Sequence, residues 1–501
     1  MAIKNDYQAW MNILIDTNIV LPLEPGSTVD LGVNTSSAIL FHNLSSQSNN
    51  TICIHPAIEY DLARDKNHER ANLRRTLIGR YKTIPSPPSI SILDTTVVGS
   101  PEVGSNDFVD NCYLAAVEAN VVDFLVSEDK GVHRKARRLG LESRVLLLKE
   151  AIDLLRNFFD KTPPPPPSVD KVYAHELDAE DEIFDSLRKD YHPNFDSWLI
   201  KCRREHREGY IIRNENGLQL AGLLIIKREE QLPLGAIGKT LKLCTFKISE
   251  KYGGNRYGEL LLKSALDYAY LNDYKYIYFT AFQKQDGLIA FANSFGFNVA
   301  EKFNERGECI IYKTLIYSPE QVETLSPLDF HIRFGPRAFV FRNNSTFIVP
   351  IIPQFHSILF PEMESQIPLF RNSRPCGNSI KKAYLCHATT TQLQPGDNLL
   401  IFRSHDLSGV TAIGVVEDTL RSIDPNEIAR FVGTRTVYRY QDIVDLCSKP
   451  TLAVKFRFAK KLKTPILLTE LKKNKILKGA PQSISRLHSE GLSWIKEKIE
   501  M

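Results

Sequence analysis

The sequence predicts a multi-domain protein that combines α/β and α+β folds. At 501 residues the chain is long for one hydrophobic core and suggests about three domains of ~150 residues each. Residues 163–167 are an unbroken proline run, which is stiff and extended and is typical of a spacer, although a proline-rich loop within one domain is the alternative. A second domain boundary, less distinct than the proline run, is expected at 318–328, where a strand-like run is followed by a polar, proline-containing stretch. We therefore expect domains over 1–160, 171–318 and 328–501, with a linker over 161–170.

The composition is that of a soluble globular protein, with 43% hydrophobic and 24% charged residues. The net charge of +4 is too small to indicate a polyanionic partner by itself. Residues 451–478 hold nine Lys/Arg against one acid, a cluster that either contacts phosphates or only solvates a surface. The eight cysteines are scattered without a Cys-x-x-Cys motif, which favours free thiols in a reducing cytoplasm. No apolar run reaches the ~18 residues of a membrane span, so we expect a cytoplasmic protein without membrane contact.

The N-terminal domain is expected to be α/β with a mainly parallel sheet, because strand-like and helix-like runs alternate. The strand candidates are 11–15, 51–54, 122–127 and 145–148, and the helix candidates are 58–82, 107–119 and 130–139. Acidic residues follow these strands or open these helices. Carboxylates that gather at the carboxyl ends of parallel strands repel one another unless a divalent cation lies between them.

Four acidic segments, in this order, resemble those of the PIN-domain nucleases over the first 150 residues or so. The segments are Ile15-Asp16-Thr17-Asn18, Pro56-Ala57-Ile58-Glu59, Asp107 to Asp110 ahead of Leu114-Ala115-Ala116, and Leu125-Val126-Ser127-Glu128-Asp129. The resemblance implies that Asp16, Glu59, Asp110 and Asp129 bind Mg²⁺ or Mn²⁺ and activate water to cut RNA, with Asp107 as an alternative to Asp110. Thr17, Asn18 and Ser127 would orient the ligands. The alternative is that these acids only cap helices.

The middle domain is expected to be α+β, with a glycine-rich turn between a strand and a helix. Such a turn offers backbone N–H groups and the positive end of a helix dipole to a pyrophosphate. This region resembles the GNAT acetyltransferases over roughly residues 171–317. The resemblance implies that the loop binds the pyrophosphate of acetyl-CoA or CoA and that the preceding strand pairs with the pantetheine arm. The loop residues are Gly253, Gly254, Asn255, Arg256, Tyr257 and Gly258, and the strand residues are Phe246, Lys247 and Ile248.

Two positions of this domain depart from the GNAT pattern. Arg256 occupies a loop position that usually holds a second glycine, although an arginine could still meet phosphate. Ala292 stands where many members carry a tyrosine that protonates the departing thiolate. The resemblance therefore favours binding of CoA more strongly than acetyl transfer.

The C-terminal domain is expected to be a small β-barrel with accessory helices, because short apolar runs are separated by turn signals. The strand candidates are Ala338–Phe341, Thr346–Ile352, Asn398–Phe402 and Val410–Val416, and Pro395-Gly396-Asp397 is a turn. This region is similar to the PUA-like superfamily of ASCH and EVE domains, which implies binding of RNA. The Gly-x-Lys-x-x-Glu-x-Arg signature of typical ASCH domains is absent. Arg403, Ser404, Arg435 and Tyr438 are the candidate contacts to nucleic acid.

These observations predict a Mg²⁺- or Mn²⁺-dependent endoribonuclease with an acetyl-CoA-binding GNAT domain and an RNA-binding PUA-like domain. The first alternative is a GNAT N-acetyltransferase that modifies an RNA-associated or protein substrate and uses the PIN-like domain as a binding platform. The second is a non-catalytic RNA-binding regulator. A toxin-like nuclease of this kind would also require an antitoxin or other inhibitory protein as a partner.

Overall fold

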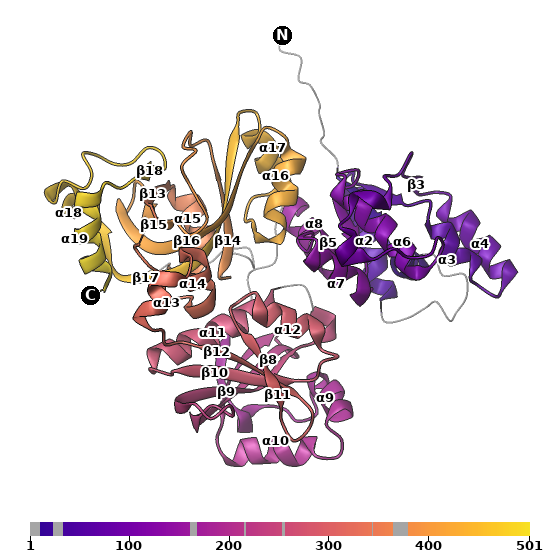
Figure 1. The fold of residues 1–501 in the computed structure, drawn as a ribbon, viewed down its shortest axis with the longest axis horizontal. Coiled ribbons are helices and arrows are strands. Elements are labelled where there is room, and N and C mark those ends of the chain that lie inside the picture. The colour runs from indigo at the N-terminus through magenta and orange to yellow at the C-terminus, as the bar shows by residue number, and fades with distance from the viewer. Residues whose placement is uncertain are drawn as a thin grey trace, which may run out of the picture. The chain divides into compact units, whose positions relative to one another are not determined.

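The computed structural model of the chain describes residues 11–23, 34–160, 168–214, 217–252, 256–342, 344–363 and 379–500. The chain divides into two compact units (Figure 1). One unit comprises residues 1–163 and 421–451, and the other comprises 164–420 and 452–501. No helix among the described residues is both long and apolar enough to cross a membrane.

The first unit contains a five-stranded sheet in the order β3-β2-β1-β4-β5, and every strand pair in it is parallel. Its strands are β1 (Asn12–Ile15), β2 (Thr51–Ile54), β3 (Lys82–Thr83), β4 (Phe124–Val126) and β5 (Val145–Leu146). Its helices are α1 (Thr17–Leu23), α2 (Thr35–Gln47), α3 (Ile58–Ala63), α4 (His68–Ile78), α5 (Thr95–Val98), α6 (Asn106–Glu118), α7 (Lys130–Arg138) and α8 (Leu148–Phe159). The predicted parallel α/β architecture is therefore confirmed.

Helices α6 and α7 bring acidic residues to the carboxyl end of this sheet. Ser105 caps α6 by accepting a hydrogen bond from the backbone N–H of Phe108, and Asp129 caps α7. The side chains of Val109 and of residues 111–117 in α6 are buried, and they pack in one core with side chains of β1 and β4. The first turn of α6 is therefore held beside the ends of the two central strands.

Residues 421–451 fall within the expected C-terminal domain, 328–501, but in the structure they pack within the first unit. They form α16 (Pro425–Val432) and α17 (Tyr440–Leu446). Arg430 donates to Asp123 at 2.6 Å, and the ring of Tyr440 lies 5.9 Å from that of Phe158. Sequence order could not indicate this packing, because the partners are about 300 residues apart.

The second unit contains two sheets, the first of which is seven-stranded and has the order β11-β12-β10-β9-β8-β7-β6. Only β9 and β10 pair in parallel. Its strands are β6 (Asp170–Tyr173), β7 (Glu208–Arg213), β8 (Leu220–Gln231), β9 (Ile237–Ile248), β10 (Tyr276–Ala281), β11 (Asn298–Phe303) and β12 (Cys309–Thr314). Its helices are α9 (Asp185–Asp190), α10 (Phe195–Arg204), α11 (Tyr257–Leu271) and α12 (Asp286–Asn293). The predicted α+β domain is confirmed.

The other sheet is mixed and has the order β14-β17-β16-β15-β13-β18. Its strands are β13 (Thr346–Ile351), β14 (Lys381–Cys386), β15 (Asn398–Arg403), β16 (Gly409–Ser422), β17 (Thr451–Leu467) and β18 (Ser485–Arg486). The accompanying helices are α13 (Pro319–Thr324), α14 (Pro327–Phe334), α15 (Pro353–Leu359), α18 (Leu468–Lys473) and α19 (Ser489–Glu500). The described strands do not close into the predicted barrel, because they form an open sheet with β14 and β18 as its two edges. Residues 338–341 form no strand, and Ala338 and Val340 pack instead against Phe330 and Phe334 of α14.

Buried polar contacts join the two sheets of this unit. The ammonium group of Lys313 is fully buried and donates to the carbonyls of Phe295, Ile332 and Arg333 at 2.7–2.9 Å. Arg457 of β17 donates to the carbonyl of Ser294 at 2.7 Å. These contacts fix β17 and α14 against the end of α12, because an unmade hydrogen bond in this buried region would be costly.

Candidate functional site

Asp16 is buried at the carboxyl end of β1, where the sequence predicted it. Its carboxylate accepts hydrogen bonds from Asn18 at 2.6 Å and from Ser127 at 2.5 Å, as expected for residues that orient it. The pKa of Asp16 is raised to about 7, first by burial and further by the charges of Asp110 and Asp61, while the bond from Ser127 lowers it. Asp16 and Asp110 therefore lie close enough to repel each other.

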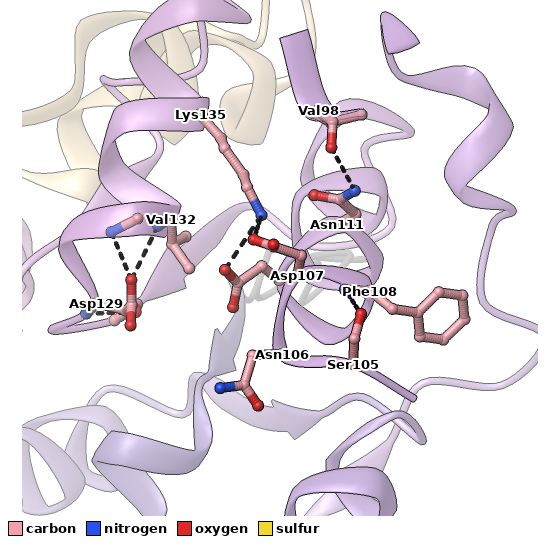
Figure 2. Close-up of polar contacts among 12 residues, drawn as sticks. Val98, Ser105, Asn106, Asp107, Phe108, Asn111, Asp129, Val132 and Lys135 are labelled. Atoms are coloured by element: carbon pink, nitrogen blue, oxygen red, sulfur yellow. Dashed lines mark hydrogen bonds and ion pairs between the residues drawn. The ribbon is translucent and has the colours of Figure 1, made fainter. Parts of the chain in front are cut away.

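Asp107 lies on the first turn of α6 and Asp110 about one turn later, and the two are not equivalent. The side chain of Asp107 is 71% exposed, whereas that of Asp110 is 19% exposed. Lys135 of α7 donates to both, at 2.8 Å to Asp107 and 3.3 Å to Asp110, and Figure 2 shows its side chain reaching toward Asp107. Burial raises the pKa of Asp110 to about 6, against the charge of Lys135. Of these two acids, Asp110 is therefore the one that faces Asp16.

Asp129 caps a helix in this structure. One of its carboxylate oxygens accepts hydrogen bonds from the backbone N–H groups of Gly131 and Val132 (Figure 2). This is the role that the capping alternative expected. Its charge also raises the pKa of Asp110, so the two carboxylates are neighbours.

Glu59 does not join this cluster, which corrects the set predicted from the sequence. Its side chain is 55% exposed and pairs with Arg75 of α4 at 3.0 Å. Asp61 faces the cluster instead, since it accepts a hydrogen bond from Thr17 at 2.5 Å and its charge raises the pKa of Asp16. Residues two apart on a helix point in different directions, so only one of these two acids can face the sheet.

The acids do not form an assembled metal site. In the part of the chain that the structure describes, no three His, Cys, Asp or Glu side chains are close enough to hold a metal ion together. Asp16, Asp110 and Asp129 each bind a protein donor instead. The side chains as placed therefore do not fit the predicted Mg²⁺ or Mn²⁺ ion.

A second candidate site opens between β9 and β10 in the second unit. The two strands pair in parallel only up to Lys242 and Tyr278. Beyond this point β9 continues to pair with β8 as far as Ile248, and β10 continues to pair with β12 as far as Ala281. The facing edges of β9 and β10 are therefore without a strand partner beyond Lys242 and Tyr278.

A β-bulge causes this separation. The pairing of β8 with β9 shifts by one residue at Cys244, because Ile225 lies opposite Thr245 while Ile226 lies opposite Leu243. A bulge bends the strand and increases its twist, which turns the end of β9 away from β10. The predicted residues Phe246, Lys247 and Ile248 lie on this diverging end.

The first turn of α11 follows β9, and its loop holds the predicted phosphate-binding residues. Gly253, Gly254 and Asn255 lie outside the described residues. Arg256 has a left-handed backbone (φ +55°) and donates to the buried carboxylate of Glu259 at 3.0 Å. A methyl group added to Gly258 would meet only Phe291, Phe246 and Ile248, at 3.7–3.9 Å. Gly258 therefore has room for a side chain, and the guanidinium of Arg256 already has a carboxylate partner.

A cavity of about 680 Å³ lies beside the opening between β9 and β10. It is lined by Leu243, Cys244, Thr245 and Phe246 of β9 and by Phe279 and Thr280 of β10, together with residues of α9, α10 and the β11–β12 hairpin. Glu308 is 4% exposed in its wall and accepts hydrogen bonds from Tyr191 at 2.7 Å, Thr280 at 3.1 Å and Asn304 at 2.7 Å. The volume of this cavity is typical of sites that bind small molecules.

Residues 170–297 match the model of the Acetyltransferase (GNAT) family. This part of the chain is a GNAT acetyltransferase domain. Position 292 of this domain carries no hydroxyl, because Ala292 stands there and is buried in the core. No curated protein matches the chain.

Several solved structures each match about a third of the chain. An acetyltransferase of the GNAT family from Staphylococcus aureus Mu50 is 12% identical, covering 30% of this chain and 100% of that chain with a TM-score of 0.25. The PaiA N-acetyltransferase from Thermoplasma acidophilum in complex with coenzyme A is 13% identical over 29% of this chain and 99% of that chain, with a TM-score of 0.23. The ASCH protein from Zymomonas mobilis is 15% identical, covering 30% of this chain and 94% of that chain, with a TM-score of 0.24. With TM-scores this low, none of these similarities supports a conclusion about this chain.

The candidate nucleic-acid contacts belong to two different units of the chain. Tyr438 is 1% exposed, so its side chain cannot reach a nucleic acid, and Arg435 belongs with it to the first unit. Arg403 and Ser404 belong to the second unit, where Arg403 is bound to Asp406 at 2.6 Å. Within the basic stretch 451–478, Arg457 is buried. Part of that stretch is therefore structural.

Proposed function

We propose that the GNAT domain binds acetyl-CoA and transfers its acetyl group to an amine held in the cavity beside β9 and β10. The observation that carries the proposal is the separation of these strands beyond Lys242 and Tyr278, next to a cavity of about 680 Å³. The unpaired edge of β9 offers backbone N–H and C=O groups to an amide-containing arm. The positive end of the α11 dipole suits a phosphate group.

When bound, acetyl-CoA supplies a thioester carbonyl that an amine can attack. The new C–N bond replaces the C–S bond, the amine loses one proton, and the departing thiolate gains one. Because position 292 is an alanine, the proton for the thiolate has to come from another side chain or from water. The cavity residues hold the amine beside the opening, which favours the reaction by proximity.

Substitutions at Gly258 test the binding of CoA. Gly258→Glu places a carboxylate in the first turn of α11, where it suits the helix dipole but repels phosphate. Gly258→Gln is matched in shape and lacks the charge. We expect calorimetry with CoA to show at least tenfold weaker binding for Gly258→Glu than for Gly258→Gln, with equal melting temperatures. If wild-type protein gives no heat with millimolar CoA, the proposal is wrong.

The acceptor and the other predicted activities need separate tests. An RNA-associated or protein acceptor stays a prediction, and a non-catalytic regulator would bind CoA without releasing free thiol from acetyl-CoA. Metal-dependent cleavage of RNA also stays a prediction, as do RNA binding and an inhibitory partner. Cleavage that persists in folded Asp16→Asn protein or in EDTA would exclude the predicted nuclease site.

A further inference from the structure

We propose that the acyl acceptor of the GNAT domain is an amine that also carries an anionic group, either a carboxylate or a phosphate. This inference rests on the proposed function and concerns the charge of its cavity. The lining contains six cationic side chains and two acidic ones. The cations are Lys201, Arg207, Lys227, Lys242, Lys302 and Arg306, and the acids are Glu305 and Glu308.

Two of these lysines are direct neighbours on adjacent strands of the sheet. Lys227 of β8 lies directly opposite Lys242 of β9 in the antiparallel pair. Like charges in this position repel each other. Glu229 forms an ion pair with Lys227, whose ammonium lies 2.7 Å from its carboxylate, and it interacts with the charge of Lys242 only from beyond ion-pair distance.

Lys242 has a different environment. Its ammonium lies 5.4 Å from the centre of the Tyr278 ring, and no carboxylate of the described chain lies within ion-pair distance of it. A ring holds a cation in place but does not neutralise it. Lys242 is also the last residue of β9 that pairs with β10, and the two strands separate beyond it. It therefore presents a positive charge at the base of the opening.

The four remaining cations divide into two groups, those with an acidic partner and those without one. Lys201 pairs with Glu205 at 3.8 Å. Arg207 is 9% exposed and binds Glu205 at 2.7 Å and the sulfur of Cys244 at 3.3 Å, so its charge is already matched. Lys302 and Arg306 lie on the β11–β12 hairpin, exposed, and no ion pair to either occurs within the described residues. By themselves these two would be ordinary solvated side chains. Together with the partly buried Lys242, they make an anion the favoured ligand of the cavity.

Glu308 supplies the complementary end of the site. Its carboxylate accepts hydrogen bonds from Tyr191, Thr280 and Asn304, which hold it in the wall of the cavity. Thr280 lies on the part of β10 that no longer pairs with β9. An amine attracted to Glu308 would therefore lie near the opening, with its anionic group toward Lys242.

The test measures binding of anions to the full chain saturated with CoA, so that the phosphate-binding end of the GNAT domain is already filled. Pyrophosphate and succinate are titrated separately by calorimetry at low salt, because they represent the phosphate and carboxylate classes. Lys242→Gln removes the central charge. Lys239→Gln is the matched control on the same strand, since Lys239 is exposed, lies outside the cavity and donates to the carbonyl of Asn272.

We expect one of the two anions to bind, and its affinity to fall at least tenfold in Lys242→Gln and to stay unchanged in Lys239→Gln. CoA affinity should be the same in both variants. Binding of neither anion, or equal binding to wild type and Lys242→Gln, would overturn the proposal. If CoA itself fails to bind, the proposed acetyl transfer is wrong, and the titration repeated without CoA still measures whether the cavity takes an anion.

Discussion

Arg256 and Glu259 form an ion pair across the first turn of α11, with 3.0 Å between the Nε of Arg256 and the carboxylate of Glu259. Glu259 is 4% exposed, and its carboxylate also accepts a hydrogen bond from the backbone N–H of Lys381 at 2.8 Å. Arg256 in turn donates to the carbonyl of Lys381 at 3.1 Å. The pair thus fastens the start of β14 to the loop that the GNAT pattern assigns to pyrophosphate.

Replacing Arg256 with glycine should destabilise the protein, although glycine suits the left-handed backbone at this position. Relief of backbone strain contributes about 1 kcal/mol, whereas a buried carboxylate left without its partner costs about 3–5 kcal/mol. We therefore expect a net loss of a few kcal/mol in chemical denaturation. The double variant Arg256→Gly with Glu259→Gln should recover part of this loss. A double variant as unstable as the single one would mean that the ion pair is not the cause.

The stability of the second unit should fall as the pH decreases below about 6.5, in part because of His331. This histidine is 2% exposed and donates to the carbonyl of Ala338 at 2.9 Å. Its pKa is lowered to about 3, first by burial and then by the charge of Arg457. Below pH 6.5 the unfolded chain takes up a proton that the folded chain does not, so stability is lost by about 1.4 kcal/mol for each pH unit.

Denaturation of His331→Gln between pH 7 and pH 4.5 checks this expectation. The variant should lose less stability over this range than the wild type. A substitution of the exposed His405 should leave the wild-type dependence unchanged. Parallel pH profiles for the wild type and His331→Gln would contradict the assignment.

Arg430→Ala should release residues 421–451 from the first unit. Asp123 is 3% exposed, so loss of Arg430 leaves a buried carboxylate and costs about 3 kcal/mol or more. Arg439→Ala is the control within the same segment, because the ion pair of Arg439 with Asp442 is exposed and contributes about 0–1 kcal/mol. Hydrogen exchange of α16 and α17 should increase strongly in Arg430→Ala only. Equal exchange in both variants would show that the pair does not hold the segment.

Gly296→Ala should be among the most damaging single substitutions in the GNAT domain. Its φ is +80°, and a methyl group would lie 1.9 Å from the carbonyl oxygen of Ile332 and 2.8 Å from the ammonium of Lys313. Gly307 has a similar φ of +75° but open space around it, so Gly307→Ala isolates the backbone strain of about 1 kcal/mol. Thermal denaturation should show a much larger loss for Gly296→Ala. Similar losses would mean that α14 moves aside at little cost.

Local sequence patterns predicted much of the fold. The alternation of apolar and helical runs in 11–160 led to the parallel sheet, because the strand and helix periods are properties of adjacent residues. The strand before the glycine-rich turn carried the resemblance to the GNAT acetyltransferases. The same reasoning failed for Ala338–Phe341, which form no strand: Ala338 and Val340 pack against α14, and the two phenylalanines pack against the core of the mixed sheet. Apolar character predicts burial there, but pairing depends on partners elsewhere in the chain.

The sites were less predictable than the elements that hold them. Asp16 and Asp110 were identified because each stands at a strand end or a helix start. Glu59 is the acid that the resemblance to the PIN-domain nucleases indicates, whereas the rotation of α3 turns Asp61 toward Asp16. Arg256 and Glu259 are three residues apart on a helix, so the sequence did contain the signal for their ion pair.

The sequence by itself determined the order of modules, the parallel sheet of the first, the α+β character of the second and the turn that precedes α11. These depend on periodicity and on residues close along the chain. Only the tertiary structure decided that 421–451 pack with the first unit, that β9 leaves β10 at Lys242, and that Lys227, Lys242 and Arg306 line one cavity. These relationships join residues from distant strands, and their positions depend on the packing and twist of whole sheets, which no local pattern encodes.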